Sequence, residues 1–231
     1  MKHCSNEFDE ALDTIGHYQN YPDMKPWVGC EYAASRVKIL IIGESHYLDV
    51  GSTYHHNPEE WYAGVTLSDK EDKGWVKTRN IISNGIKSKW KSKSKTIYRN
   101  IEKALFESEA DFCSSSTAFS RIAFLNYFQR PAEQTGKSIK VSQLDADVSQ
   151  DVVGQVAKAI ASEIIIFTSS LAYRHAKRSG LLKAFDEQGI KYTRTPHPGM
   201  PWWNRVSKVY GNRTGKQHFV DFVNSVVKTE A

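Results

Sequence analysis

The chain has 231 residues, of which 40% are hydrophobic and 25% are charged, and its formal net charge is +5. This length can bury the core of one α/β domain, and the composition is ordinary for a globular protein. No apolar run approaches the roughly 20 residues that cross a bilayer, and the N-terminal residues contain acids and no apolar signal core. We therefore expect a single domain over 1–231, located in the cytoplasm and without a membrane partner.

The first half of the chain predicts few regular elements. The apolar spacing predicts a short helix over 7–16, which Gly16 ends, and a first strand over 37–42. The stretch from about 49 to 95 is polar, aromatic and rich in turn residues, which is typical of a long insertion. A helical period follows over 96–107, with Thr96 as its expected cap.

The second half of the chain has a regular pattern in which strands alternate with helices. Strands are expected over 121–128, 163–169 and 190–195, and helices over 151–161, 170–189 and 215–228, with Gly189 ending the second helix. This alternation predicts a three-layer α/β/α fold with a central four-stranded parallel sheet.

The segment 87–99 holds five lysines and one arginine and no acid. Such a run attracts a polyanion by counterion release, and the interleaved Trp90 and Tyr98 are able to stack on bases. A solvated loop or helix face is the simpler interpretation of the charge alone. The cysteines, Cys4, Cys30 and Cys113, are odd in number and widely spaced, which argues for reduced thiols and against a metal cluster.

Polar side chains follow each of the four predicted strands. They are Glu44 to Tyr47 after the first strand, Asn126 in the second, Ser169 and Ser170 after the third, and His197 between two prolines after the fourth. Because the carboxyl ends of parallel strands meet at one edge of a sheet, we expect these four groups to lie together.

Each of these residues also has a purely structural interpretation. Glu44 is able to form an ion pair or cap a helix, and Asn126 is a common turn residue. Ser169 and Ser170 suit the N-cap of the following helix. Trp202 and Trp203 are adjacent, and neighbouring residues of an extended segment point opposite ways, so we expect at least one to be exposed.

In this order the motifs resemble those of the uracil-DNA glycosylase superfamily, over about residues 37 to 228. "GESHY" is similar to the family's first motif in its glycine, glutamate and tyrosine, and "NYFQRP" to its second in Asn126, Arg130 and Pro131. "SSLA" is similar to the turn after the third strand, and "HPGMPWWNR" keeps the histidine and proline of the last motif. The chain differs at Ser45, which stands where the best-known branch has an aspartate, and it lacks the four cysteines of the branches that hold an iron–sulfur cluster.

The resemblance implies a role for each residue. Glu44 would position or deprotonate a water molecule, and His197 would donate a hydrogen bond to the departing base. Asn126, Tyr47 and Ser45 would form the base pocket. The contacts to DNA would come from Ser169, Ser170, Arg130, Met200, Trp202, Trp203 and Arg205. It implies a monofunctional DNA glycosylase that acts on uracil or a modified pyrimidine, works as a monomer and needs no cofactor or metal.

Three other functions remain open at this stage. A nucleic-acid-binding module of the same fold could have lost catalysis, as the replacement of the aspartate by Ser45 suggests. A metal-dependent hydrolase could use Glu44 with His46, His55, His56 and His197, although no HxH or HExxH motif is present. An enzyme of small-molecule nucleotides is the weakest alternative, because the chain has no Walker-type or GxGxxG loop.

Overall fold

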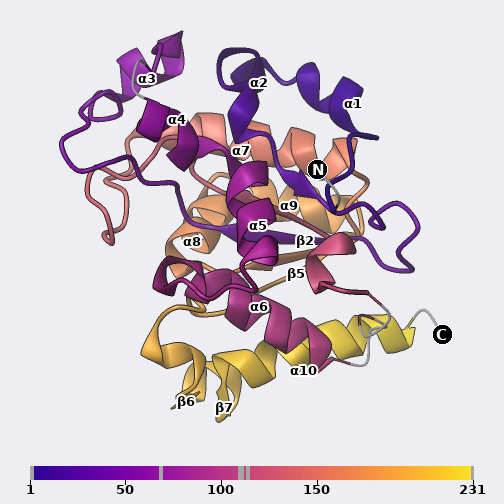
Figure 1. The fold of residues 1–231 in the computed structure, drawn as a ribbon. Coiled ribbons are helices and arrows are strands. Elements are labelled where there is room, and N and C mark those ends of the chain that lie inside the picture. Colours follow the sequence, from indigo (N-terminus) through magenta and orange to yellow (C-terminus); the bar gives the residue numbers. More distant parts are fainter. Residues whose placement is uncertain (1–2, 68–69, 109–111, 113–114, 230–231) are drawn as a thin grey trace.

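The computed structural model describes residues 3–67, 70–108, 112 and 115–229 (Figure 1). One sheet lies between two groups of helices. In Figure 1, α6 and α10 lie on one side of the sheet and α7 and α9 on the other. Cys113 lies outside the described residues, and Cys4 and Cys30 are free thiols.

The sheet has five strands in the order β1-β3-β2-β4-β5. The strands are β1 (Trp27–Val28), β2 (Ile39–Gly43), β3 (Ile122–Asn126), β4 (Ile164–Phe167) and β5 (Lys191–Arg194). Strand β2 is parallel to β3 and β4, and β4 is parallel to β5, whereas β1 is antiparallel to β3. The α/β class is confirmed, but the sheet is mixed and has one strand more than the sequence predicts. A two-residue strand is too short to leave a periodic pattern.

The strands are buried because both faces of the sheet are covered. All five residues of β2 are buried, as a continuous apolar run in a parallel strand requires. Leu40 and Ile42 belong to one hydrophobic core and Ile39 and Ile41 to the other, since successive side chains point to opposite faces.

Helices α1, α2, α3, α4, α7, α8 and α9 contribute to the first core, and α5, α6 and α10 to the second. Their bounds are α1 Asp9–Asp13, α2 Gly16–Asn20, α3 Pro58–Gly64, α4 Lys70–Val76, α5 Thr78–Lys87, α6 Thr96–Phe106, α7 Gln143–Ala159, α8 Ser170–Arg178, α9 Leu181–Glu187 and α10 Gly215–Thr229. Short 3-10 helices are η1 Pro22–Met24, η2 Lys93–Lys95, η3 Ala118–Ser120, η4 Pro201–Trp203 and η5 Lys208–Tyr210, and a small hairpin joins β6 (Val206–Ser207) to β7 (Arg213–Thr214). None of the helices described is both long and apolar enough to cross a membrane.

Several predicted helix boundaries are wrong. The first helix, α1, ends at Asp13, and Gly16 is the first residue of α2. The helix predicted over 151–161 begins at Gln143, where Ser142 and Asp145 form a capping box. The helix predicted over 170–189 is two helices, because Gly180 adopts a left-handed conformation with φ of 85° between α8 and α9.

The predicted polar insertion is folded against the rest of the protein. Segment 49–95 contains α3, α4 and α5, and its Trp61, Val76 and Ile82 are buried in the two cores. The expected cap Thr96 is the first residue of α6, and the N-cap position belongs to Lys95, whose side chain makes no capping hydrogen bond.

Candidate functional site

The carboxylate of Glu44 is held by the start of helix α8. Glu44 is the first residue after β2, and its Oε2 accepts a hydrogen bond of 2.6 Å from the hydroxyl of Ser169. Ser169 is also the N-cap of α8, where its oxygen accepts the backbone N–H of Ala172 at 3.2 Å. Short O–H···O bonds to carboxylates are among the stronger hydrogen bonds, so the orientation of Glu44 is fixed by a buried partner.

Asn126 lies beside Glu44 at the end of the neighbouring strand. It pairs in register with Gly43, and a Cβ added to Gly43 would lie only 2.3 Å from Asn126 Oδ1. The amide side chain therefore occupies the space that Gly43 leaves free. The segments that follow β2 and β3 stay paired beyond the strands, because the backbone N–H of Phe128 donates to Glu44 O at 2.9 Å.

His197 lies close enough to Glu44 for the two side chains to interact electrostatically. Burial lowers its pKa, and the negative charge of Glu44 partly opposes this by raising it. Nδ1 accepts the backbone N–H of Gly199 at 3.2 Å, so the proton of the neutral ring is assigned to Nε2. The loop is held from helix α6, where Asn100 Nδ2 donates to Pro198 O at 2.7 Å. Asn100 gave no signal in the sequence, since nothing distinguishes it from other polar helix residues.

Tyr47 completes the group around Glu44. Burial raises the pKa of its phenol, and the charge of Glu44 raises it further. The charge of this one carboxylate therefore acts on both Tyr47 and His197. Backbone pairing of Tyr47 with Ala132 keeps this segment beside the residues that follow β3.

Ser45 and His46 have different surroundings from their neighbours. The hydroxyl of Ser45 is buried and has no hydrogen-bond partner in the described part of the chain. His46 points into the protein, where Nε2 lies 3.2 Å from Thr78 Oγ1, and burial lowers its pKa to about 4. His46 is thus a buried structural histidine.

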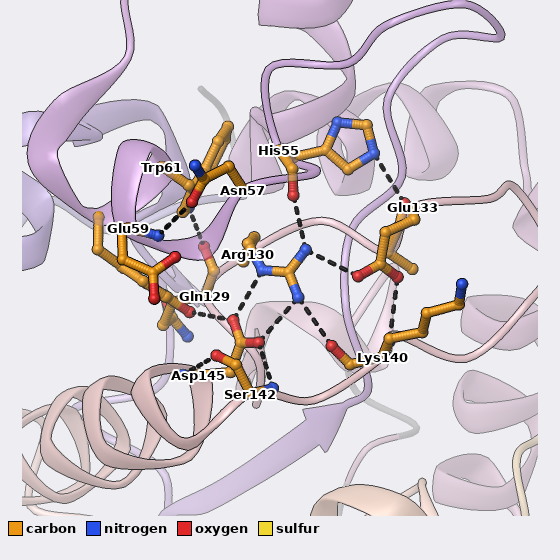
Figure 2. Close-up of polar contacts among 12 residues, drawn as sticks. His55, Asn57, Glu59, Trp61, Gln129, Arg130, Glu133, Lys140, Ser142 and Asp145 are labelled. Carbon is orange, nitrogen blue, oxygen red and sulfur yellow. Dashed lines mark hydrogen bonds and ion pairs between the residues drawn. The ribbon is translucent and has the colours of Figure 1, made fainter.

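Arg130 does not have the free guanidinium that a phosphate contact requires. Only 1% of its side chain is exposed, and Figure 2 shows it surrounded by carboxylates and carbonyl oxygens. Asp145 accepts two hydrogen bonds from it at 2.8 Å, and its other acceptors are Glu133, His55 O and Lys140 O. These contacts use all five of its N–H donors, and the Asp145 carboxylate, whose burial would raise its pKa, is kept at a lowered pKa by Arg130. The expected DNA contact of Arg130 is therefore corrected to a structural role.

The segment after His197 separates into buried and exposed residues. Trp203 is 1% exposed and packs edge-on against Phe219 of α10, so its expected DNA contact is also corrected. Trp202 is 56% exposed and Met200 53%, as the expectation of at least one exposed tryptophan requires. The guanidinium of Arg205 lies 5.7 Å from the centre of the Trp202 ring.

Two further exposed apolar residues, Val206 and Val209, lie on the adjoining hairpin and 3-10 turn. Nothing in the sequence distinguishes these two valines from core positions. Ser170 is half-buried in the first turn of α8. Burial raises the pKa of the Tyr210 phenol, and the hydroxyl of Ser170 opposes this by lowering it.

Of the histidines of the metal-dependent alternative, His55 and His56 have ring centres 4.8 Å apart, but they do not form a metal site with the others. His55 Nε2 contacts Ala132 O at 3.0 Å, and His46 faces Thr78. In the residues that the structure describes, no three His, Cys, Asp or Glu side chains are placed to hold a metal ion. Two surface hollows, of about 400 and 660 Å³, lie at Arg130 and along β5, and neither is lined by Glu44, Asn126 or His197.

No protein-family model matches this chain, and a search of the curated proteins found no relative. Its function is therefore inferred from the geometry of the site and from the resemblance of its motifs.

Proposed function

We propose that the protein is a DNA glycosylase-like enzyme that hydrolyses the N-glycosidic bond of a flipped uracil or modified pyrimidine. The observation that carries the proposal is the grouping of side chains from three strand ends around one carboxylate. Ser169 donates to Glu44, Asn126 lies over the adjacent Gly43, and the charge of Glu44 acts on His197.

The two sides of the reaction require different groups, and this site supplies both. On the water side, Glu44 orients a water molecule and takes its proton as the water oxygen bonds to C1′ of the sugar. The bond from C1′ to the base nitrogen breaks, and the base leaves with the electron pair. Nε2–H of His197 donates a hydrogen bond to the base oxygen on which the negative charge develops.

Selection of the base is assigned to the neighbours of Glu44. The amide of Asn126 offers one donor group and one acceptor to the edge of a pyrimidine. Tyr47 forms a wall that limits the size of the base. Ser45 brings an uncommitted hydroxyl next to Glu44, where the best-known branch of the family has an aspartate.

Extrusion of a nucleotide leaves a gap in the duplex that needs a filling side chain and costs a few kcal/mol. Met200 and Trp202 are exposed apolar side chains in the segment that follows His197, and we assign this role to them. Arg205 and Ser170 are assigned to the adjacent phosphates. Ser169 is reassigned from phosphate binding to positioning Glu44, because it is buried.

The order of the parallel strands, β3-β2-β4-β5, supports the finer proposal of a three-layer glycosylase-like fold. In such folds ligands bind beyond the carboxyl ends of the strands, which is where Glu44 and Asn126 lie. We further propose that the protein acts as a monomer in the cytoplasm without a cofactor.

The test is a base-release assay on DNAs that contain uracil or one of several modified pyrimidines, with the freed base detected by mass spectrometry. We expect release of at least one base by the natural protein, and a fall of about 10²- to 10⁴-fold with Glu44→Gln. His197→Ala is expected to reduce the rate by about 10²- to 10³-fold. Glu107→Gln, which removes an exposed carboxylate that pairs with Lys216, is the matched control and should leave the rate unchanged.

Release that is insensitive to both Glu44→Gln and His197→Ala would reject this site. Binding of DNA with no release of any tested base would instead favour a module that has lost catalysis.

A further inference from the structure

Four exposed lysines lie at the end of helix α5 and in the segment that leads to α6. We call Lys87, Lys89, Lys91 and Lys93 the lysine ridge. All four are exposed, and none forms an ion pair with a carboxylate in the described part of the chain. Like charges this close repel one another, so a chain gains no stability from gathering them without a partner.

The aromatic residues of this segment point into the protein. Trp90 is 3% exposed, lies on Gly85, and its indole N–H donates to a carboxylate oxygen of Glu102. Tyr98 packs against Trp90 and against Phe124 of strand β3. The expectation that Trp90 and Tyr98 stack on bases is therefore wrong, and the ridge presents only lysines and serines.

Hydrogen bonds hold the backbone of the ridge in one shape. Arg99 donates to Trp90 O at 2.9 Å and to the hydroxyl of Thr96, which in turn donates to Lys93 O at 2.7 Å. Lys89 and Trp90 both have positive φ, of 51° and 55°, a conformation that the buried indole keeps in place. The lysines thus extend from a fixed base, which reduces the entropy lost when they bind a ligand.

The ridge is joined directly to the loop that carries His197. Ile97, in the first turn of α6, lies beside Gly199, and Asn100 donates to Pro198 O. The ridge ends at Lys93, three residues before the first residue of α6, Thr96.

We propose that the lysine ridge binds the phosphate backbone of DNA beyond the nucleotide that enters the site, through charge and without base stacking. This inference rests on the proposed function for the identity of the ligand. Ser88 donates its hydroxyl proton to Gly85 O at 3.0 Å, whereas Ser92 and Ser94 hydrogen-bond each other at 2.8 Å and leave one hydroxyl proton for a phosphate. The ridge carries none of the large exposed apolar side chains, which lie outside 87–95. It therefore lacks the apolar centre of a protein–protein interface.

The test compares two variants that lose the same charge. The ridge variant is Lys87→Gln, Lys89→Gln, Lys91→Gln and Lys93→Gln. The control variant replaces exposed lysines in the last turns of α6 and α7, on α9 and at the first residue of β5, namely Lys103→Gln, Lys158→Gln, Lys183→Gln and Lys191→Gln. Dissociation constants for a fluorescent duplex and for one of its strands are measured by anisotropy over a series of salt concentrations.

Each phosphate contact contributes about 0.9 to the slope of log affinity against log salt on duplex DNA. We expect the ridge variant to lower this slope by about 2 to 4 and the control variant to leave it unchanged. A variant with arginine at the same four positions keeps the charge and should have the slope of the natural protein. Circular dichroism and thermal unfolding check that every variant is folded.

Equal slopes for the ridge and control variants, or no DNA binding by the natural protein, would overturn the inference. The control variant should also leave the rate of base release unchanged. Base release by the natural protein, together with equal slopes for the ridge and control variants, would reject the DNA-binding role of the ridge but not the glycosylase proposal. A ridge-dependent slope with no base release would reject the glycosylase proposal and leave the ridge as a DNA-binding surface.

Discussion

Ser169 donates its hydroxyl proton to Glu44 at 2.6 Å while its oxygen accepts the backbone N–H of Ala172 at 3.2 Å. One side chain therefore caps helix α8 and orients the carboxylate after β2. Because β4 and β2 are neighbours, the first turn after one strand reaches the first side chain after the other. The position of Glu44 is thus determined by the packing of the sheet and does not depend on a flexible loop.

Ser169→Ala should lower both stability and activity. Loss of the cap costs about 1 kcal/mol of the free energy of unfolding, and a carboxylate without its partner should slow base release by about 10- to 100-fold. The matched control is Ser142→Ala, which removes the side-chain cap of α7 and its contact with the N–H of Asp145. Ser142→Ala should lower the free energy of unfolding by the same amount and leave the rate of base release unchanged. Equal rates for the two variants, measured at equal folded fractions, would show that Ser169 is only a cap.

The sequence predicts the four strand ends of this site to within two residues because the signal is local. An apolar run that stops at Gly43 or Asn126 marks the end of a buried parallel strand, and topology then brings such ends together. His197 could be placed in the same way, since it follows a strand and is flanked by prolines. These expectations needed only periodicity and the rule for parallel sheets.

The residues that were wrongly assigned are those whose surroundings come from distant parts of the chain. Arg130 is buried because Asp145, Glu133 and two carbonyl groups surround it, and no pattern near position 130 reveals this. Trp203 follows another tryptophan, the exposed Trp202, and differs from it only in packing against Phe219. Trp90 lies between two exposed lysines in the sequence, yet its ring packs against Phe119. Burial of a large polar or aromatic side chain is a tertiary property, so motif spacing alone does not predict it.

Arg130→Lys should destabilise the fold without changing how DNA binding depends on salt. A lysine keeps the charge but loses the paired contact with Asp145 and leaves carbonyl groups unsatisfied, at a cost of about 2 to 4 kcal/mol. Urea unfolding measures the first effect, and anisotropy titrations of the folded variant measure the second. A variant as stable as the natural protein whose salt slope falls by about one would restore the phosphate role that the structure argues against.

The two adjacent tryptophans should respond in opposite ways to truncation. Trp203→Ala removes a buried side chain and should lower the free energy of unfolding by about 3 to 5 kcal/mol. Trp202→Ala should change stability by less than about 0.5 kcal/mol, because the ring is 56% exposed. It should instead weaken DNA binding by about 1 to 3 kcal/mol, the range measured for stacking on bases. Unchanged affinity of Trp202→Ala for DNA would remove this residue from the proposed contacts.

Acidification should destabilise the protein through its buried histidines, and His46 should account for a definable share. Burial lowers the pKa of His46 to about 4, whereas the unfolded chain has a pKa near 6.5. Between these values the unfolded state binds a proton that the folded state does not, so the free energy of unfolding falls as the pH falls from about 6.5 towards 4. Above pH 6.5 the stabilising contribution of neutral His46 is fully present. From pH 7 to pH 5 this share is about 2 kcal/mol.

His17, whose pKa is also about 4, adds to the same loss. Urea unfolding at the two pH values measures the total, and His46→Gln should reduce it by about 2 kcal/mol even if this variant is less stable at pH 7. If His46→Gln loses as much stability between pH 7 and pH 5 as the natural protein does, His46 is not held in its neutral form by burial.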